Sequence, residues 1–272
     1  MAALACGTPV APRAAPAPAQ RSTGKLHTCN ICGTTREFTT ANGRPASECP
    51  ICKSRERHRL LLIYLEHELK LFDKKLDVLH FSPQSAEETV FGHQPNWRYM
   101  TSNISTSEDI RLDLTDIRMV DDLWDIIIVY HILEHIPDDQ KAMREMFRIL
   151  RPGGRAFVQV PLELGLRATH EDPSITDPRQ RNKHFGQHDH VRKYAAPELR
   201  QRLEAAGFVV EVVDYAARLD PKVVETHRLV GEFDPPMDQS IWVCTKPWAP
   251  QQAAVGELPE PAKPTRPGTM PQ

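Results

Sequence analysis

The clearest pattern of apolar positions lies in residues 124–161. Residues 125–130 form an almost continuous apolar run, which is typical of a parallel strand covered on both faces. Polar residues and a proline end this run, and Asp138 or Asp139 can cap a following helix. That helix carries four apolar residues at helical spacing, Met143, Met146, Phe147 and Leu150. An Arg-Pro-Gly-Gly sequence then breaks the helix, and residues 155–160 supply a second strand, so the pattern predicts a right-handed strand–helix–strand unit.

The same reasoning predicts the rest of one α/β domain around this unit. A helix begins at Pro197 and ends at Gly207. An apolar stripe predicts a linking helix over residues 57–75, and residues 218–238 form a connecting loop or an extra helix. Further strands are predicted at 76–84, which includes the loop leaving the strand, and at 98–103, 110–114, 208–213 and 239–246.

Length and composition limit the class of protein. A chain of 272 residues with 40% hydrophobic content can hold one α/β domain and a small accessory module. A formal net charge of −2 argues against bulk attraction to nucleic acid. There is no apolar run of membrane-spanning length and no signal-peptide pattern, so we expect a soluble, cytoplasmic protein with no membrane partner. Residues 1–24 and 248–272 are Pro-rich and poor in large apolar side chains, so we expect a disordered arm and tail.

Two C-x2-C pairs, separated by sixteen residues, stand near the N-terminus: Cys29 and Cys32, then Cys49 and Cys52. This spacing suits a four-thiolate zinc site, in which each pair lets two thiolates reach one ion. Two disulfides are the alternative, which a reducing compartment disfavours. The pattern therefore predicts a zinc ribbon over residues 25–56, with a structural zinc because four thiolates leave no open position.

A basic run, Lys-Ser-Arg-Glu-Arg-His-Arg, follows the second pair at residues 53–59. Such a run can bind the phosphates of RNA or of a phosphorylated substrate. The alternative is the solvated start of a helix, which the absence of interleaved aromatic residues favours.

Two segments carry a resemblance to a known family. The sequence HILEHIPDD at 131–139, followed by a helix closed by RILRPGG, resembles the central segment of class I S-adenosylmethionine-dependent methyltransferases of the type 11 group. The sequence FGQHDHVRKY at 185–194, together with the cysteine pairs, is similar to a subset of those enzymes that carries a zinc ribbon. The resemblance covers about residues 27–247. It implies an α/β fold with a seven-stranded, doubly wound, Rossmann-like sheet over 76–247 and S-adenosylmethionine as the cofactor. Residues 162–196 form a long polar insertion at the carboxyl edge of this sheet, where a substrate lid is usually built.

The resemblance also implies where the amino-acid end of the cofactor lies. In most of these enzymes the loop after the first strand is a Gly-rich turn, whereas here it reads His80, Phe81, Ser82 and Pro83, without glycine. Ser82 and Pro83 can still make a tight turn and cap the next helix. Cofactor binding at this turn is the favoured hypothesis, and a plain strand end in a protein that has lost its cofactor is the alternative.

Four further residues match cofactor-binding positions of the family. Asn103 stands where an acid usually accepts hydrogen bonds from the ribose, and a turn role is its alternative. Asp113 matches the position that accepts from the adenine amino group, beside the backbone of Leu114, and an acid there can instead cap a turn. His131 is expected to line the pocket near the reacting methyl group. Glu134 and His135 are catalysts or merely residues at a helix start.

The predicted lid is rich in titratable residues, including His188, Asp189 and His190. Methyl transfer to a hydroxyl needs an aligned nucleophile and removal of a proton, and an imidazole titrates near neutrality. His188 or His190 is therefore the candidate base, with Asp189 to orient it. The alternatives are that these histidines fasten the lid to the scaffold, or that they bind a second metal, which the His-Asp-His spacing disfavours.

These observations favour an S-adenosylmethionine-dependent O-methyltransferase that acts on a small molecule or a modified metabolite. One alternative is an RNA methyltransferase in which the ribbon and the basic run position the strand. Another is a non-catalytic binding module, because the first loop lacks glycine and Asn103 lacks a charge.

Overall fold

The computed structural model describes residues 24–105 and 108–248, so the predictions for residues 1–23 and 249–272 lie outside the described residues. A seven-stranded sheet forms the centre, in the order β12-β13-β9-β8-β5-β6-β7. Only β13 is antiparallel to its neighbours β9 and β12, and the other pairs are parallel. This confirms the predicted doubly wound sheet. Its strands are β5 (Leu76–Phe81), β6 (Trp97–Asn103), β7 (Ile110–Arg111), β8 (Trp124–Tyr130), β9 (Leu150–Gln159), β12 (Val209–Val213) and β13 (Ile241–Thr245).

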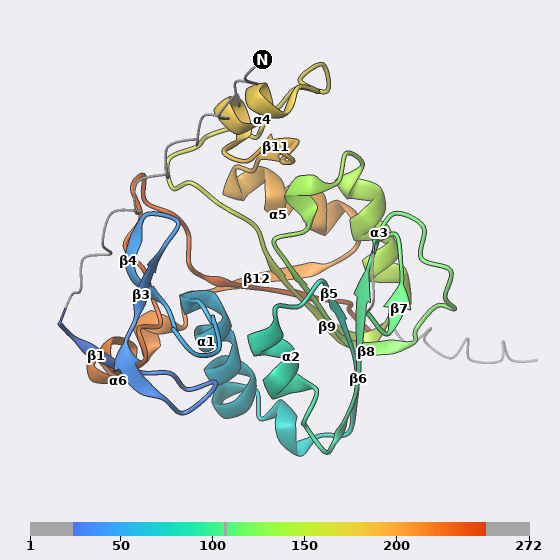
Figure 1. Ribbon diagram of the computed structural model, residues 1–272. Helices are drawn as coiled ribbons and strands as arrows, with labels where there is room; N and C mark the ends of the chain where they lie inside the picture. The colour runs from blue at the N-terminus through green and yellow to red at the C-terminus, as the bar shows by residue number, and fades with distance from the viewer. Residues whose placement is uncertain (1–23, 106–107, 249–272) are drawn as a thin grey trace, which may run out of the picture.

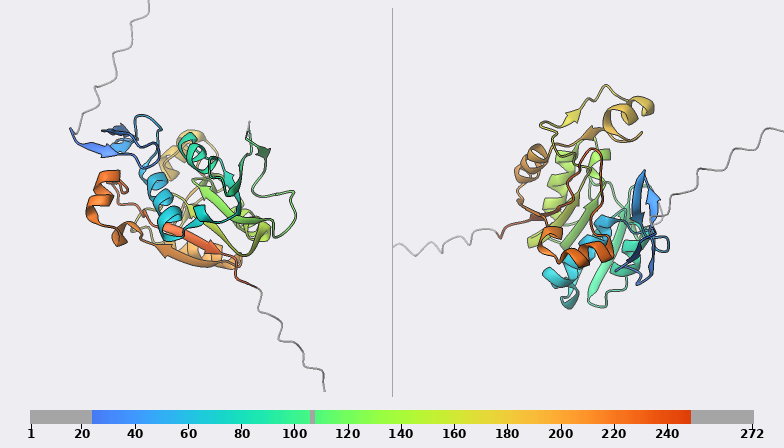
Figure 2. Two further views of the ribbon diagram at one scale, coloured as in Figure 1. Left: turned by 90° about the horizontal axis from the view of Figure 1, so that it is seen from below. Right: turned by 90° about the vertical axis from the view of Figure 1, so that its left-hand side faces the viewer.

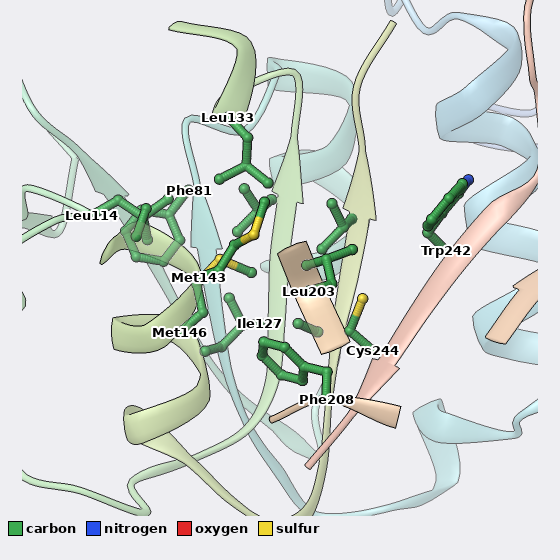
Figure 3. Close-up of a cluster of buried hydrophobic side chains, with 14 of the residues drawn as sticks. Phe81, Leu114, Ile127, Leu133, Met143, Met146, Leu203, Phe208, Trp242 and Cys244 are labelled. Carbon is green, nitrogen blue, oxygen red and sulfur yellow. The ribbon is translucent and has the colours of Figure 1, made fainter. Parts of the chain in front are cut away.

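Helices cover both faces of the sheet (Figure 1). On β8, Ile127 and Val129 point to one cluster of buried side chains, whereas Ile126 and Ile128 point to another. The first cluster lies under α3 (Asp139–Ile149) and α5 (Ala196–Ala205) and is drawn in Figure 3. The second lies under α1 (Glu56–Ile63), its π-helical extension η1 (Tyr64–Glu68), η2 (Leu71–Asp73) and α2 (Ser85–Phe91). Burial on both faces explains why β8 reads as a continuous apolar run.

The helix of the strand–helix–strand unit begins as predicted but ends differently. Asp138 is the N-cap of α3, and its carboxylate accepts a hydrogen bond from the backbone N–H of Lys141. The Arg-Pro-Gly-Gly sequence is not a turn before the strand, because β9 already begins at Leu150. A register shift against β8 absorbs these residues, and the Arg151 guanidinium contacts the carboxylates of Asp77 and Asp125 at 2.8 and 2.7 Å.

The N-terminal module consists of two short antiparallel hairpins (blue in Figure 1). Their strands are β1 (Leu26–Thr28), β2 (Thr35–Glu37), β3 (Thr39–Ala41) and β4 (Arg44–Glu48). The module lies beside α6 (Pro221–His227), which follows the one-turn helix η4 (Ala216–Arg218). His27 Nδ1 lies 2.9 Å from the Glu225 carbonyl oxygen, and His227 Nδ1 lies 2.7 Å from that of Thr28. The segment predicted as a loop or an extra helix thus contains a short helix, α6, that supports the module, followed by a loop.

Arg59, the last residue of the basic run, also joins the module to the main domain. Its guanidinium is buried and donates hydrogen bonds to the carbonyl oxygens of Ser54, Ser47 and Arg228, at 2.6, 3.2 and 2.8 Å. A charge in this position is held by backbone acceptors, which replace the water lost on burial.

Residues 162–196 lie beyond the carboxyl ends of β8 and β9 (yellow in Figures 1 and 2). They contain a hairpin of β10 (His170–Glu171) and β11 (Arg192–Lys193), and the helix α4 (Pro178–Phe185). Arg192 fastens this segment down, because its guanidinium donates to the carbonyl oxygens of Leu133 and Pro137. Within the described ranges, no helix combines the length and the apolar character needed to cross a membrane.

Candidate active site and cysteine cluster

A cavity of about 450 Å³ opens at the carboxyl ends of β5, β8 and β9. The order of the strands reverses between β5 and β8, and α/β sheets bind their ligands at such a switch point. Gln84 follows β5, His131 follows β8, and Gln159 ends β9. Arg57 of α1 and His190 of the 162–196 segment line the cavity from other parts of the chain. The cavity is therefore built by segments that are far apart in the sequence.

The turn after β5 bends without a glycine because Ser82 adopts the left-handed conformation, with φ of 47°. Its N–H donates to the Ser102 carbonyl oxygen at 2.7 Å. Gln84, rather than Ser82 or Pro83, is the N-cap of α2, and its N–H donates to the Glu87 carboxylate at 3.0 Å. Gln84 also lines the cavity wall.

His80 and Phe81 lie beneath this turn and not in the cavity wall. Both side chains are buried, on opposite faces of β5. His80 contacts the Tyr99 hydroxyl at 2.9 Å, and burial lowers its pKa to about 3. Phe81 belongs to the same buried cluster as Leu114, as Figure 3 shows.

Asn103 is the last residue of β6, and Asp113 follows the neighbouring strand β7, so both lie at the same edge of the sheet. Asn103 Oδ1 accepts from the N–H and the hydroxyl of Ser105, both at 3.0 Å. Asp113 Oδ1 accepts from the N–H and hydroxyl of Thr115, both at 2.8 Å, and these bonds lower the pKa of Asp113. Both side chains therefore make the turn contacts that were the alternative to cofactor binding, and the second oxygen of Asp113 takes no part in these bonds.

His131 and the residues after it contribute polar groups to the cavity wall. The backbone of His131 is left-handed, with φ of 56°, and its N–H donates to the Gln159 carbonyl oxygen at 2.8 Å. Its Nδ1 lies 3.1 Å from Glu134 Oε1, and burial lowers its pKa. Glu134 and His135, which the sequence left open as catalysts or helix-start residues, both line the cavity.

Of the three predicted catalytic residues, only His190 lines the cavity, and the Nδ1 atom of His188 lies 3.9 Å from Asp189 Oδ1. His190 is buried and lines the cavity, and its Nδ1 lies 3.1 Å from the Phe185 carbonyl oxygen. Burial lowers the pKa of His190. His188 is not in the cavity wall, and its side chain is 71% exposed. Asp189 contacts the His135 ring, with 3.2 Å between Oδ2 and Nδ1.

Arg57 and Gln159 are among the cavity residues that the sequence analysis did not single out as site residues. The Nε atom of Arg57 is buried without a hydrogen-bond partner in the described part of the chain, and burial lowers its pKa to about 10. The sequence placed Arg57 in the basic run at residues 53–59, but the run did not show which of its side chains point into the cavity. Gln159 was recognisable as a polar residue at the end of an apolar strand.

A buried polar cluster lies below the turn after β5. Glu87 is 3% exposed, and burial raises its pKa to about 7. Its carboxylate oxygens lie 3.9 Å from His58 Nε2 and from His80 Nε2. Burial also lowers the pKa of His58, so both neighbouring rings are held neutral.

The four predicted ligand cysteines come together in one cluster. The sulfur atoms of Cys29 and Cys52 are 3.5 Å apart, and those of Cys32 and Cys49 are 3.7 Å apart. Four thiolates at about 2.3 Å around a tetrahedral ion are about 3.8 Å from one another, whereas a disulfide is about 2.05 Å long. The donor set and its spacing therefore fit a zinc ion.

The two C-x2-C pairs also share one backbone conformation. In each, the N–H of the first cysteine donates to the carbonyl oxygen five residues later, and its own carbonyl oxygen accepts from the residue four later. Gly33 and Lys53, the residues in the latter position, are both left-handed. Two identical turns present their thiols to the same point.

A family described as a methyltransferase domain matches residues 44–213, more than half of the chain. A protein named "Probable S-adenosylmethionine-dependent methyltransferase" from Mycolicibacterium smegmatis is 26% identical over 139 residues, 47% of this chain and 49% of that protein. The "Ubiquinone/menaquinone biosynthesis C-methyltransferase UbiE" of Vibrio vulnificus is 39% identical over 49 residues, 18% of this chain and 19% of that protein. The chain thus spans about half, or less, of the length of these curated relatives.

Among solved structures, a Burkholderia thailandensis 1,6-didemethyltoxoflavin-N1-methyltransferase is similar to the chain with a TM-score of 0.44 and 14% identity. The similarity covers 70% of this chain and 78% of that one.

Proposed function

The chain belongs to the methyltransferase domain family, with the fold of the class I S-adenosylmethionine-dependent enzymes, and we propose that it methylates a hydroxyl of a small molecule bound in the 450 Å³ cavity. The observation that carries this proposal is the position of the cavity. It opens at the switch point of the sheet and is lined by His131 and His190, two titratable side chains from separate segments.

The cofactor would lie along the carboxyl ends of β5, β6 and β7, where it would supply an electrophilic methyl group. The turn at Ser82 and Pro83 would lie against its amino-acid end, supported from below by His80 and Phe81. Asn103 would contact the ribose. The free oxygen of Asp113 would accept from the adenine amino group, beside the Leu114 backbone, and His131 would stand near the reacting centre.

His190 is the residue that we propose as the proton acceptor. Its Nδ1 is directed to the Phe185 carbonyl oxygen, which can only accept a hydrogen bond, so Nδ1 carries the hydrogen and Nε2 the lone pair. His188 lacks this position in the cavity wall. Replacing His190 by Gln is expected to lower kcat by about 100-fold or more, the usual contribution of a positioned base, with little change in cofactor affinity. His188→Gln is the matched comparison, and equal activity of the two variants would remove the base assignment.

The cysteine cluster is proposed to hold a structural zinc ion, which would fix the module against α6 and thereby fix the start of α1. Arg57, which lines the cavity, is the second residue of α1. The module would in this way shape the acceptor site without contributing to the chemistry.

The basic run supports a small acceptor better than RNA. Arg55 contacts the Glu48 carboxylate at 3.2 Å, Arg59 is buried among backbone carbonyls, and Arg57 lines the cavity. These three guanidiniums therefore do not form a stripe that is open to a nucleic-acid backbone. The RNA alternative predicts binding that weakens steeply with salt, and the small-molecule proposal does not.

Titration calorimetry of the zinc-loaded chain with S-adenosylmethionine tests the proposal first. Measurable binding heat is expected, and its absence would favour a non-catalytic binding module. Incubation with labelled cofactor and separate pools of metabolites and RNA then identifies the acceptor. Label that enters only the RNA pool would overturn the small-molecule assignment.

A further inference from the structure

Glu134, His135 and His190 come together in the cavity wall. Glu134 and His135 belong to the one-turn helix η3 (Leu133–His135) after β8, whereas His190 precedes β11. One ligand atom from each residue lies within 4.8 Å of those of the other two. The two rings are perpendicular, at an interplanar angle of 86°, with their centroids 4.7 Å apart.

In each of these side chains, one polar atom has a partner, and the other has none among residues 24–105 and 108–248. His190 Nδ1 donates to the Phe185 carbonyl oxygen, and His135 Nδ1 lies 3.2 Å from the Asp189 carboxylate. Glu134 Oε1 lies 3.1 Å from His131 Nδ1. Glu134 Oε2 is buried without a hydrogen-bond partner in the described part of the chain.

These contacts leave one acceptor atom on each of the three side chains without a hydrogen-bond partner among the described residues, in side chains whose ligand atoms lie within 4.8 Å of one another. Both Nδ1 atoms face oxygen acceptors, so each ring carries its hydrogen on Nδ1 and its lone pair on Nε2. A carboxylate oxygen is also an acceptor, so the three remaining atoms include no donor. Lone pairs gathered in a buried site repel one another unless a cation lies between them.

We propose that Glu134 Oε2, His135 Nε2 and His190 Nε2 bind one divalent transition-metal ion. Two imidazoles and one carboxylate suit Zn²⁺, Fe²⁺ or Co²⁺ better than Mg²⁺, which prefers oxygen ligands and water. A carbonyl or carboxylate that accepts from the other ring nitrogen is the usual support of a metal-binding histidine, and both rings have one. Three protein ligands leave open positions on the cavity side.

An ion in this site would also define the acceptor, a point that rests on the proposed function. Its open positions would bind the acceptor through oxygen and would lower the pKa of a bound hydroxyl, whose proton passes to water. While His190 Nε2 binds the ion, its lone pair cannot accept a proton. The ion then takes over the role proposed for His190 as the base, because it favours the ionised form of the acceptor oxygen. Arg57 lines the same cavity, and its Nε atom has no hydrogen-bond partner among the described residues. A negatively charged acceptor that binds the ion through an oxygen atom therefore fits this wall.

The test uses the full chain with one zinc retained in the cysteine cluster, without cofactor or acceptor. Co²⁺ is titrated in, and its visible absorption is measured together with elemental analysis. We expect one Co²⁺ per chain with nitrogen and oxygen ligation and no thiolate charge-transfer band. His190→Ala and Glu134→Gln should each weaken Co²⁺ binding by at least tenfold, and Asp189→Asn by about tenfold through loss of the support of His135.

The matched control is His188→Ala, which removes an exposed imidazole from the same turn and should bind Co²⁺ as the unchanged chain does. One zinc per chain and an unchanged near-ultraviolet circular dichroism spectrum show that each variant is folded. The proposal is overturned if the unchanged chain does not bind Co²⁺. It is also overturned if Glu134→Gln and His190→Ala bind Co²⁺ as tightly as the unchanged chain does. Because no methyl transfer is measured, this result is independent of the proposed activity.

Discussion

Glu87→Gln tests whether a carboxyl group is held in the interior below the cavity. Glu87 is the third residue of α2, and one of its oxygens accepts from the Gln84 N–H. Glu87 Oε1 is buried without a hydrogen-bond partner in the described ranges. Glutamine has the same shape and keeps an oxygen acceptor for the Gln84 N–H, so the substitution removes the ionisable group and little else.

The magnitude follows from the pKa of Glu87, which burial raises from 4.5 to about 7. The folded chain therefore holds this proton more tightly than the unfolded chain. The stability from that proton is complete below pH 4.5 and is lost as the pH rises to about 7. At about 1.4 kcal/mol for each pH unit, the loss amounts to about 3 kcal/mol. The variant should match the unchanged chain near pH 4 and exceed its stability by about 3 kcal/mol above pH 7.

Urea unfolding at a series of pH values, with zinc present throughout, measures this difference. Glu66→Gln is the control, because Glu66 has a half-exposed carboxylate in the neighbouring helix η1, and its effect should stay within about 0.5 kcal/mol at every pH. A Glu87→Gln difference that is the same at pH 4 and pH 8 would refute the reasoning. It would mean that Glu87 ionises in the folded chain as it does in water.

Three further changes test other parts of the structure. Arg59→Leu should lower the free energy of unfolding by about 3 kcal/mol or more, because it leaves the carbonyl oxygens of Ser47 and Ser54 without their donor, as urea unfolding would show. Asp113→Asn should weaken S-adenosylmethionine binding by about tenfold in calorimetry, because an amide accepts more weakly than a carboxylate, and unchanged affinity would exclude the adenine contact. Cys49→Ser should abolish tight zinc binding and expose α1 to proteolysis, and full zinc content by elemental analysis would contradict the four-thiolate site.

The local sequence determined the elements whose physical cause is local. β8 needs apolar side chains on both faces, and its six-residue run from Asp125 to Tyr130 predicted a strand of the central sheet. Asp138 capped α3 as predicted, since an N-cap depends only on the next turn of chain. The cysteine cluster was also predictable from the sequence, because each C-x2-C turn brings two thiols together without help from the rest of the fold.

Other features depended on contacts that are distant in sequence. The sequence offered a loop or an extra helix for residues 218–238 but gave no sign that α6 would support the cysteine module, because the hydrogen bonds of His27 and His227 join residues almost 200 positions apart. The turn after β5 was expected to be unusual without glycine, but the left-handed backbone of Ser82 is set by its bond to Ser102 on the neighbouring strand.

The tertiary structure alone decided the use of each side chain in two polar clusters. Arg57 and Arg59 are two residues apart and so point to different sides of α1, one into the cavity and the other among backbone carbonyls. His188 and His190 are equally close in sequence, yet one is exposed and the other is buried beside Glu134 and His135. The residue types determined the chemistry available to this chain, and packing between distant segments determined which of those groups reach the cavity.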